Sequence, residues 1–446
     1  MEKIKNILVN VCRFIVAPVF IFSGFVKAVD PLGTQYKIQD YLEALGSPEL
    51  LPDWATLGMS VLLSALEFLL GVLLLFAIHR RLVSKAIVAF LVVMTAITLW
   101  LALANPVSDC GCFGDAVHLS NWQTFGKNVA LLVMAVVIAR WPLKMLRFIS
   151  KTNQWIVINY TLLFTLAVSV WCLYTLPLFD FRPYHVGADI RKGMEVPVGE
   201  KEPQYETTFI LEKNGERKEF TLDNYPDSTW TFIDSKTVMT EEGYVPPIHD
   251  FVLELTDTGE DITDSLLAAP GYTFLLISPS LEHADDSHFG SMDQLYEYAK
   301  DHGYGFYGVT ASGDDAIGRW RDLTGAEYPF CHADHTMLKT VIRSNPGLVL
   351  IKEGVIIRKW SHNQLPELSE ASPALEEHEL GRMPEDSVPR KIGTILLWFA
   401  LPLFLLTLAD RLWAWTRWVK KGSLPPAPSQ GGGEQEKGDT DTIENG

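Results

Sequence analysis

Positive charge is scarce in this sequence. Lys and Arg number 37 against 54 Asp and Glu, and the imbalance is concentrated in residues 181–388, where 38 acidic residues face 17 basic ones. A segment with a charge balance of −21 repels the phosphates of nucleic acids and of anionic membrane surfaces. Neither is therefore expected as its partner.

Internal repeats and broken helices are missing as well. No segment recurs with a period of about 20 to 50 residues, and no long apolar segment shows the paired half-helices, interrupted by Gly or Pro, that are typical of secondary transporters. The sequence therefore disfavours a small-molecule carrier.

Long apolar segments, by contrast, are abundant, and 48% of the chain is hydrophobic. A helix needs about 20 apolar residues to cross a bilayer. Lys3 and Lys5 precede the first such segment, but no small-residue cleavage site follows it, so we expect a retained helix rather than a signal peptide. Six spans are predicted, at about 7–28, 56–78, 84–104, 124–140, 155–178 and 392–413.

Basic residues near the ends of these spans predict their orientation, because Lys and Arg stay on the cytoplasmic side. They cluster at 79–85, 140–151 and 417–421. Both termini are therefore expected in the cytoplasm of a bacterial inner membrane, with residues 180–388 exported. The tail, residues 422–446, is rich in Pro, Gly and charge and is expected to be disordered.

The exported segment has two parts of different character. Residues 180–247 contain short alternating strands around a hairpin signal, Asn214-Gly215. Residues 248–365 begin with a strand, a turn and a second strand, which form a leading hairpin. Strands then alternate with helices, one of them closed by Gly303, and the segment ends in a hairpin turned at Glu353-Gly354, which is an α/β pattern. Residues 366–390 are expected to be a linker to the last span. The predicted fold class is a membrane α-helical bundle with an exported α/β domain.

Cys110-Gly111-Cys112 lies in a short polar gap between two spans. Cysteines two residues apart can be separated by about 7 Å at most, close to the upper limit for a disulfide. Gly111 permits the tight backbone that such a ring needs, and a strained ring is more easily reduced. Zinc needs four ligands, or three and a water, and only His118 is near, so no metal is expected. A redox pair, a structural clip and two unpaired thiols remain open.

A few other polar and sulfur-containing residues are candidates for a role in the bundle or in the exported domain. Arg13 and Glu67 lie inside predicted spans, where ionisable side chains normally face the bundle interior. They could form a pair there, or Arg13 could extend to the inner surface. Lys27 and Asp30 are expected to anchor the outer interface. Cys331 is expected in a loop, and Cys12 and Cys172 are interpreted as small apolar residues within spans.

Three stretches, 20–45, 65–75 and 108–138, resemble in this order the MauE family of the wider DoxX-like group. The "CGCFG" loop followed by "LSNWQTFGKN" is the most specific part. The resemblance implies a four-helix membrane domain over residues 1–150 that assists disulfide formation, with Cys110 and Cys112 as the redox pair. It also implies a link to thiols or to a quinone, which is the candidate cofactor. It does not imply methylamine metabolism for this chain.

The exported α/β segment resembles the thioredoxin-like fold in its TlpA or peroxiredoxin-like form. The resemblance is carried by residues 249–267, 272–280 and 344–360, with Pro346 after Asn345 in the place of the family's cis-proline. It implies a groove there for extended peptide. Where the family carries its CxxC motif, this chain reads "SPSLEHADDSH" without a cysteine, so the usual dithiol chemistry is not expected.

Two functions from different classes follow. The first is a thiol-disulfide oxidoreductase whose Cys110 and Cys112 exchange disulfides with an exported client or a periplasmic thiol carrier. The second is a non-catalytic membrane scaffold whose degenerate thioredoxin-like domain binds a partner protein. Loss of activity on removal of Cys110 would favour the first.

Overall fold

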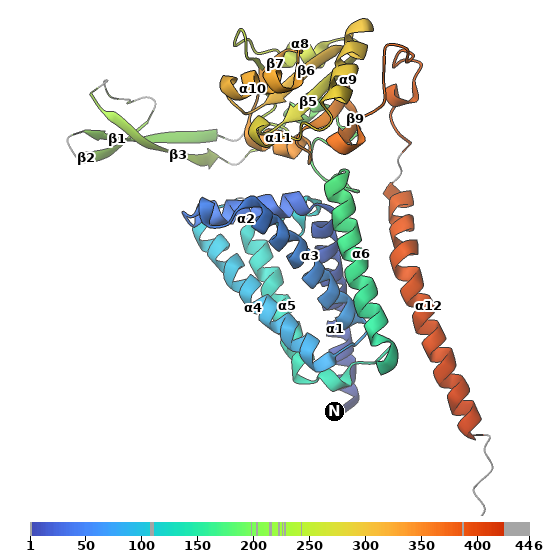
Figure 1. Cartoon of the computed structure of the whole chain (residues 1–446). Helices are drawn as coiled ribbons and strands as arrows, with labels where there is room; N and C mark the ends of the chain where they lie inside the picture. Colours follow the sequence, from blue (N-terminus) through green and yellow to red (C-terminus); the bar gives the residue numbers. More distant parts are fainter. Residues whose placement is uncertain are drawn as a thin grey trace, which may run out of the picture.

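The computed structural model describes residues 2–107, 111–197, 199–201, 204–213, 216–221, 224, 226, 229–241, 243–385 and 388–422. In this part of the chain, six helices are long and apolar enough to cross a membrane, as the sequence predicts. Figure 1 shows them below the strands. They are α1 (Glu2–Val29), α3 (Asp53–Leu75), α4 (Arg80–Ala104), α5 (Asn121–Arg140), α6 (Gln154–Tyr174) and α12 (Val388–Gly422).

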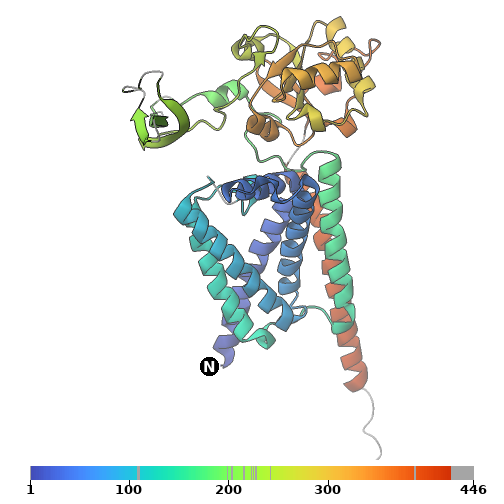
Figure 2. The ribbon, with the colours of Figure 1, turned by 60° about the vertical axis from the view of Figure 1, so that its left-hand side comes forward.

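Helices α1 and α3 pack closely because glycines face the neighbouring backbone. A Cβ atom at Gly24 would lie 2.3 Å from the backbone nitrogen of Phe68, and one at Gly71 would lie 2.7 Å from that of Ile21. Small residues at such contacts let membrane helices approach to backbone distance. Figures 1 and 2 show α1 and α3 side by side within the bundle.

A short helix, α2 (Pro31–Ala44), lies across the upper end of the bundle (Figure 1). It begins at Asp30, whose side chain accepts a hydrogen bond from the backbone N–H of Gly33, and Pro31 occupies the first helical position. Both features are typical of helix starts. Tyr36, Tyr41, Leu42 and Leu45 predict this short amphipathic helix from the sequence, and the structure confirms it.

The α/β domain contains a six-stranded sheet in the order β4-β7-β6-β5-β8-β9. Strands β5, β6 and β7 are parallel, and β4, β8 and β9 run antiparallel to their neighbours. The strands are β4 (Glu254–Leu255), β5 (Tyr272–Ser278), β6 (Gly305–Thr310), β7 (Phe330–His332), β8 (Gly347–Lys352) and β9 (Val355–Ser361).

Helices cover both faces of this sheet and close two hydrophobic cores. Helices α9 (Phe289–Asp301) and α10 (Asp314–Thr324) bury residues such as Leu295 and Trp320 on one face. Helices α8 (Thr263–Ala268) and α11 (His335–Val341) bury residues such as Leu266 and Met337 on the other. With a cis peptide bond between Asn345 and Pro346 just before β8, this is the expected thioredoxin-like arrangement.

Three expectations about this domain need correction. Cys331 lies in strand β7 rather than in a loop, because that short apolar strand fills the sheet between β4 and β6. The leading hairpin is reduced to β4 and a single bridge between Glu254 and Asp261. The expected linker begins too early, since Leu368 and Leu375 are buried in the core of the domain.

A separate sheet of three strands, in the order β2-β1-β3, stands apart from the α/β domain (Figure 1). Its strands are β1 (Gln204–Lys213), β2 (Glu216–Thr221) and β3 (Thr231–Glu241). Lys213 pairs with Glu216, so the expected hairpin is present. The predicted turn residues Asn214 and Gly215 lie outside the described residues, and so do residues 423–446 of the predicted tail.

Candidate functional site

The loop between α4 and α5 carries the candidate site at the end of the bundle that faces the α/β domain. Cys112 is disulfide-bonded and 8% exposed, whereas Cys110 lies outside the described residues. Gly111 has a φ of +60°, and a Cβ atom there would lie 2.9 Å from Cγ of Lys37. Both the backbone conformation and the contact therefore require glycine between the two cysteines.

Two polar side chains of the bundle hold the backbone of Cys112 from below, and a third pairs with one of them. Its carbonyl oxygen accepts hydrogen bonds of 2.7 Å from the hydroxyl of Ser23 and of 2.7 Å from the ammonium group of Lys27. Lys27 also forms a 2.7 Å ion pair with Glu67. All three side chains are buried. Such a pair is stable inside a bundle because each charge has a partner.

The expected pair between Arg13 and Glu67 is wrong, although both side chains are buried in the bundle. Arg13 instead donates to the carbonyl oxygens of Leu74, Leu75 and Leu146 at the other end of the bundle. Leu75 ends α3 at the level of Arg13, and Glu67 lies eight residues away, about 12 Å along the helix at 1.5 Å per residue. That separation exceeds the reach of the Arg13 side chain.

Lys27 and Asp30, expected as interface anchors, both have partners in the protein. Lys27 is only 5% exposed and belongs to the buried cluster with Glu67. Asp30 pairs with an arginine of the α/β domain, as described below. The sequence did not reveal either pairing, because neither Lys27 nor Asp30 lies at a helical spacing from its partner.

A cavity lies beside Cys112 in the half of the bundle nearer the α/β domain. Its polar lining residues are Ser23, Lys27, Glu67, Lys127 and Asn128, and its volume is about 20 Å³. The ammonium group of Lys127 lies 4.0 Å from the ring centroid of Phe113, which is a cation–π contact. The remaining lining is apolar and includes Val19, Phe20, Phe90, Leu91, Met94 and Leu131.

Arg343 joins the α/β domain to the bundle. Its Nε lies 3.0 Å from a carboxylate oxygen of Asp30, and its Nη2 lies 3.2 Å from one of Asp115, three residues beyond Cys112. The guanidinium also stacks on Tyr36 at 5.2 Å. Burial opposes the charge of Arg343, but Asp30 and Asp115 outweigh burial and raise its pKa above the ordinary value.

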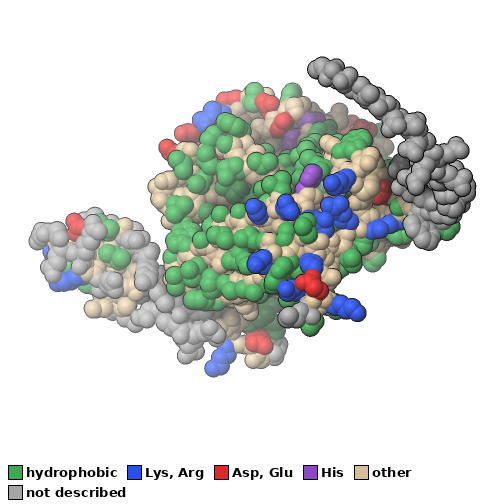
Figure 3. All heavy atoms as spheres, turned by 90° about the horizontal axis from the view of Figure 1, so that it is seen from below, with side chains coloured by type: hydrophobic (Ala, Val, Ile, Leu, Met, Phe, Trp, Pro, Cys, Tyr) green, Lys and Arg blue, Asp and Glu red, His purple; other side chains and the backbone are tan. Residues whose placement is uncertain are grey.

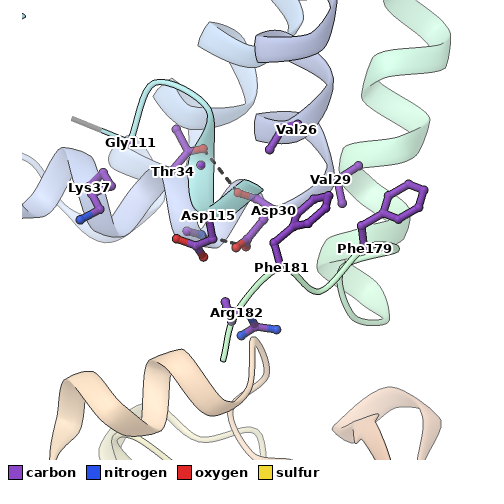
Figure 4. A pocket seen from close by; sticks show the side chains of 12 residues that line it. Val26, Val29, Asp30, Thr34, Lys37, Gly111, Asp115, Phe179, Phe181 and Arg182 are labelled. Atoms are coloured by element: carbon purple, nitrogen blue, oxygen red, sulfur yellow. Dashed lines mark hydrogen bonds between the residues drawn. The ribbon is translucent and has the colours of Figure 1, made fainter. Parts of the chain in front are cut away.

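Figure 4 shows the pocket next to this contact, with Asp30 and Asp115 close together and Arg182 on the chain that leads from α6 into the α/β domain. Phe179 and Phe181 line the side of the pocket nearer α6. The cysteine loop, the start of α2 and this connecting chain therefore meet in one place.

The cis-proline segment lies two residues beyond Arg343. The Asn345 side chain accepts a 2.6 Å hydrogen bond from the Ser278 hydroxyl and donates one of 2.8 Å to the carbonyl oxygen of Ser280. These serines belong to the segment that replaces the CxxC motif. Cys331 is fully buried, and burial raises the pKa of its thiol to about 12. Among the described residues, no group of three or more His, Cys, Asp or Glu side chains could hold a metal ion.

The fold and the site define a multi-pass membrane protein whose helical bundle carries a disulfide-bonded cysteine beneath a thioredoxin-like α/β domain. Residues 5–140 match the family model described as methylamine utilisation protein MauE, so the bundle is MauE-like, as its sequence indicated. Residues 205–242, which contain the three-stranded sheet, match a model described as a domain of unknown function.

Among solved structures, the solution structure of a candidate protein disulfide isomerase from Bacteroides thetaiotaomicron is similar to this chain. The identity is 20%, over 26% of this chain and 76% of that one, with a TM-score of 0.21. A likeness this weak adds nothing to the fold assignment, which depends on the strand order. No curated protein matches the sequence.

Proposed function

We propose that the protein is a membrane thiol-disulfide redox protein in which Cys110 and Cys112 form the reactive pair. The observation that carries this proposal is the disulfide-bonded Cys112, held at the outer end of a MauE-like bundle. Cys12, Cys172 and Cys331 are free thiols. Cys110 is therefore the cysteine that we assign as the partner of Cys112.

The reaction is an exchange of a disulfide for two thiols. A thiolate of an exported client or of a periplasmic thiol carrier attacks one sulfur of the pair, and a mixed disulfide forms. The second client thiol resolves it, so the client gains a disulfide and the pair becomes a dithiol. The same steps in reverse would reduce the client.

Residues beneath the loop have assigned roles in this exchange. Lys27 and Ser23 fix the carbonyl group of Cys112, which keeps the loop in one position while a partner approaches. The positive charge of Lys27 favours the thiolate form of a nearby cysteine. Glu67 holds Lys27 in place through their ion pair. Lys27, Ser23 and Glu67 are thus positioning residues.

A quinone is the proposed electron acceptor for the reduced pair. The lining of the cavity beside Cys112 has suitable chemistry, with aromatic and aliphatic side chains and the hydrogen-bond donors Lys127 and Asn128. Its volume of about 20 Å³ admits only a water-sized group, so a quinone headgroup would enter only if side chains of the lining moved apart. A bound quinone would supply two-electron oxidation of the dithiol. Lys127 would donate a hydrogen bond to one of its oxygens, because Lys27 already donates to Ser23, Glu67 and the carbonyl oxygen of Cys112.

The proposed location is a bacterial inner membrane with both termini in the cytoplasm. Arg81, Lys85 and Arg147 are exposed at the end of the bundle away from the α/β domain, and Figure 3 shows Lys and Arg side chains gathered on the molecule seen from below. Lys and Arg favour the cytoplasmic side. The cysteine loop and the α/β domain would then be exported.

The segment around Asn345 and Pro346 is the proposed contact for an extended client peptide. Its neighbour Arg343 contacts Asp115 of the cysteine loop. A peptide bound at this segment would therefore lie near Cys112. The absence of a cysteine from residues 278–288 makes this domain a docking module rather than a second redox centre.

The test is thiol trapping in native membranes with a mass-shifting maleimide, before and after mild reductant and with the quinone pool oxidised or depleted. The proposal expects Cys110 and Cys112 to move between the protected and the labelled state with these treatments. Cys112→Ser should abolish the response, and Cys172→Ser, which removes a buried free thiol, should not. A pair that stays oxidised under every treatment would contradict the redox role and favour the scaffold function.

A further inference from the structure

A second cavity lies at the end of the bundle opposite the cysteine loop, between the chain that connects α5 to α6 and the last turns of the span on α12. Its volume is about 370 Å³. Residues from the segment 147–152 form one wall, and residues from the segment 410–414 form the other. Because α6 begins at Gln154 and the span on α12 ends at Thr416, the cavity lies where the headgroups of one leaflet are expected.

Hydrogen bonds join the two walls, so the cavity is already formed in the folded chain. Asp410 of α12 accepts one of 2.5 Å from the backbone N–H of Ser150 and one of 2.9 Å from Nδ2 of Asn153. Arg411, the next residue of α12, donates to the backbone carbonyl oxygen of Arg147. Asp410 is only 9% exposed, and each of its carboxylate oxygens has a donor on the opposite wall. Its carboxylate is therefore engaged within the protein.

Arg147 and Arg411 give the cavity its positive charge. They come from different walls, and both are exposed. The carbonyl group that Arg411 contacts orients its guanidinium without neutralising it. In the part of the chain that the structure describes, no carboxylate forms an ion pair with either arginine. A guanidinium presents N–H donors in a fixed plane that match the oxygens of a phosphate group.

The surroundings of the cavity suit a lipid. Phe148 and Ile149 contribute apolar surface to its lining, and Figure 3 shows Lys and Arg side chains gathered on this end of the molecule. Toward the middle of the membrane, α6 exposes Leu163 and α12 exposes Leu405. Only 6% of the apolar stretch of α12 is buried inside the protein. Acyl chains that extend from a headgroup in the cavity would therefore find apolar helix surface.

We propose that this cavity binds the phosphate group of an anionic phospholipid, with Arg147 and Arg411 as its cationic contacts. The bound lipid bridges the α5–α6 connection and α12, and so holds the last membrane helix against the bundle. Free phosphate offers the same charge, but the position of the cavity at the ends of two spans favours a headgroup anchored in the bilayer. This inference is independent of the proposed disulfide exchange.

The experiment is native mass spectrometry of the full chain in detergent, titrated with phosphatidylglycerol or with phosphatidylcholine. The wild-type chain is expected to retain phosphatidylglycerol in preference to phosphatidylcholine. Arg147→Gln should weaken the binding of phosphatidylglycerol about fivefold, which is the contribution of one cation near a membrane surface. The double variant Arg147→Gln with Arg411→Gln should weaken it about 30-fold, because the two contributions multiply.

Arg81→Gln is the matched control. Arg81 is an exposed arginine at the same end of the bundle, and it does not line the cavity. Its replacement removes the same charge and should leave the binding of phosphatidylglycerol unchanged. Arg147→Lys keeps the charge of the site and should retain the preference for phosphatidylglycerol.

Four outcomes would overturn the proposal. Two are equal retention of both lipids by the wild-type chain and unchanged binding by Arg147→Gln. The third is an equal loss in Arg81→Gln, which would indicate diffuse attraction to the basic end of the bundle. The fourth is displacement of the lipid by millimolar inorganic phosphate, which would indicate a site for the free anion. Arg147→Gln decides the matter even where the double variant does not fold, because the Arg147 guanidinium forms no hydrogen bond or ion pair with the described residues.

Discussion

Replacing Arg343 with glutamine should loosen the contact between the α/β domain and the bundle. The guanidinium lies 3.0 Å from Asp30 and 3.2 Å from Asp115, and its side chain is only 7% exposed. Glutamine keeps much of the length but removes the charge from both pairs. Breaking a buried ion pair costs about 3 to 5 kcal/mol.

The lower end of that range applies, because the two carboxylates remain partly hydrated. The side chains of Asp30 and Asp115 are 19% and 30% exposed, so each regains water when Arg343 is lost. About 3 kcal/mol corresponds to an approximately 150-fold increase in the undocked population. The contacts of Ser361 and Asn363 with the Tyr174 carbonyl oxygen persist, and the domain stays tethered.

Hydrogen–deuterium exchange of the full chain measures this opening. Arg343→Gln should accelerate exchange in peptides that cover α2 and residues 111–116, with little change in α4. Lys192→Gln serves as the control, because its ion pair with Asp189 lies on the same domain and the lysine is 79% exposed. Unchanged protection of α2 and of the cysteine loop in Arg343→Gln would refute the reasoning.

Two further predictions concern buried groups. Lys27→Met should destabilise the bundle by about 3 kcal/mol in thermal unfolding, because it leaves the Glu67 carboxylate buried without its partner. The double variant Lys27→Met with Glu67→Leu should lose clearly less stability than the sum of the losses of the two single variants. Additive losses would contradict the pairing. Cys331, with a thiol pKa raised to about 12 by burial, should resist iodoacetamide at pH 8 in the folded chain and react fully in denaturant, with Cys331→Ala as the blank. Rapid labelling of the folded chain would contradict its burial.

Most elements of the fold could be predicted from local sequence patterns, because helices, strands and turns are determined largely by residues that are close in the sequence. The six apolar segments, the helix closed by Gly303 and the hairpin turned at Glu353-Gly354 follow from hydrophobic length and turn chemistry. Gly303 and Gly354 indeed have positive φ values. Strand β7 and helix α11 were missed because they are three and seven residues long, too short for a periodic signal.

The candidate site was predictable only in part. The "CGC" motif indicated the loop and the need for Gly111, both of which depend on local geometry. The partners of the loop come from distant segments: Lys27 lies 85 residues from Cys112, and Arg343 lies 228 residues from Asp115. No spacing rule for helices or strands connects residues so far apart. The sequence alone therefore gives no means of assigning partners to Lys27 or to Arg343.

The charges that hold the cysteine loop act from opposite sides. Lys27 holds the carbonyl group of Cys112 from within the bundle, and Arg343 holds the carboxylate of Asp115 from the α/β domain. With Cys112 only 8% exposed, a client thiolate has little access while both contacts persist. The lower contact lies among the helices of the bundle, whereas the upper one joins two parts of the chain and would open if the α/β domain moved away from the bundle. If the proposed exchange is correct, Arg343→Gln should therefore speed the reduction of the Cys112 disulfide by a small thiol, whereas Lys192→Gln should leave that rate unchanged.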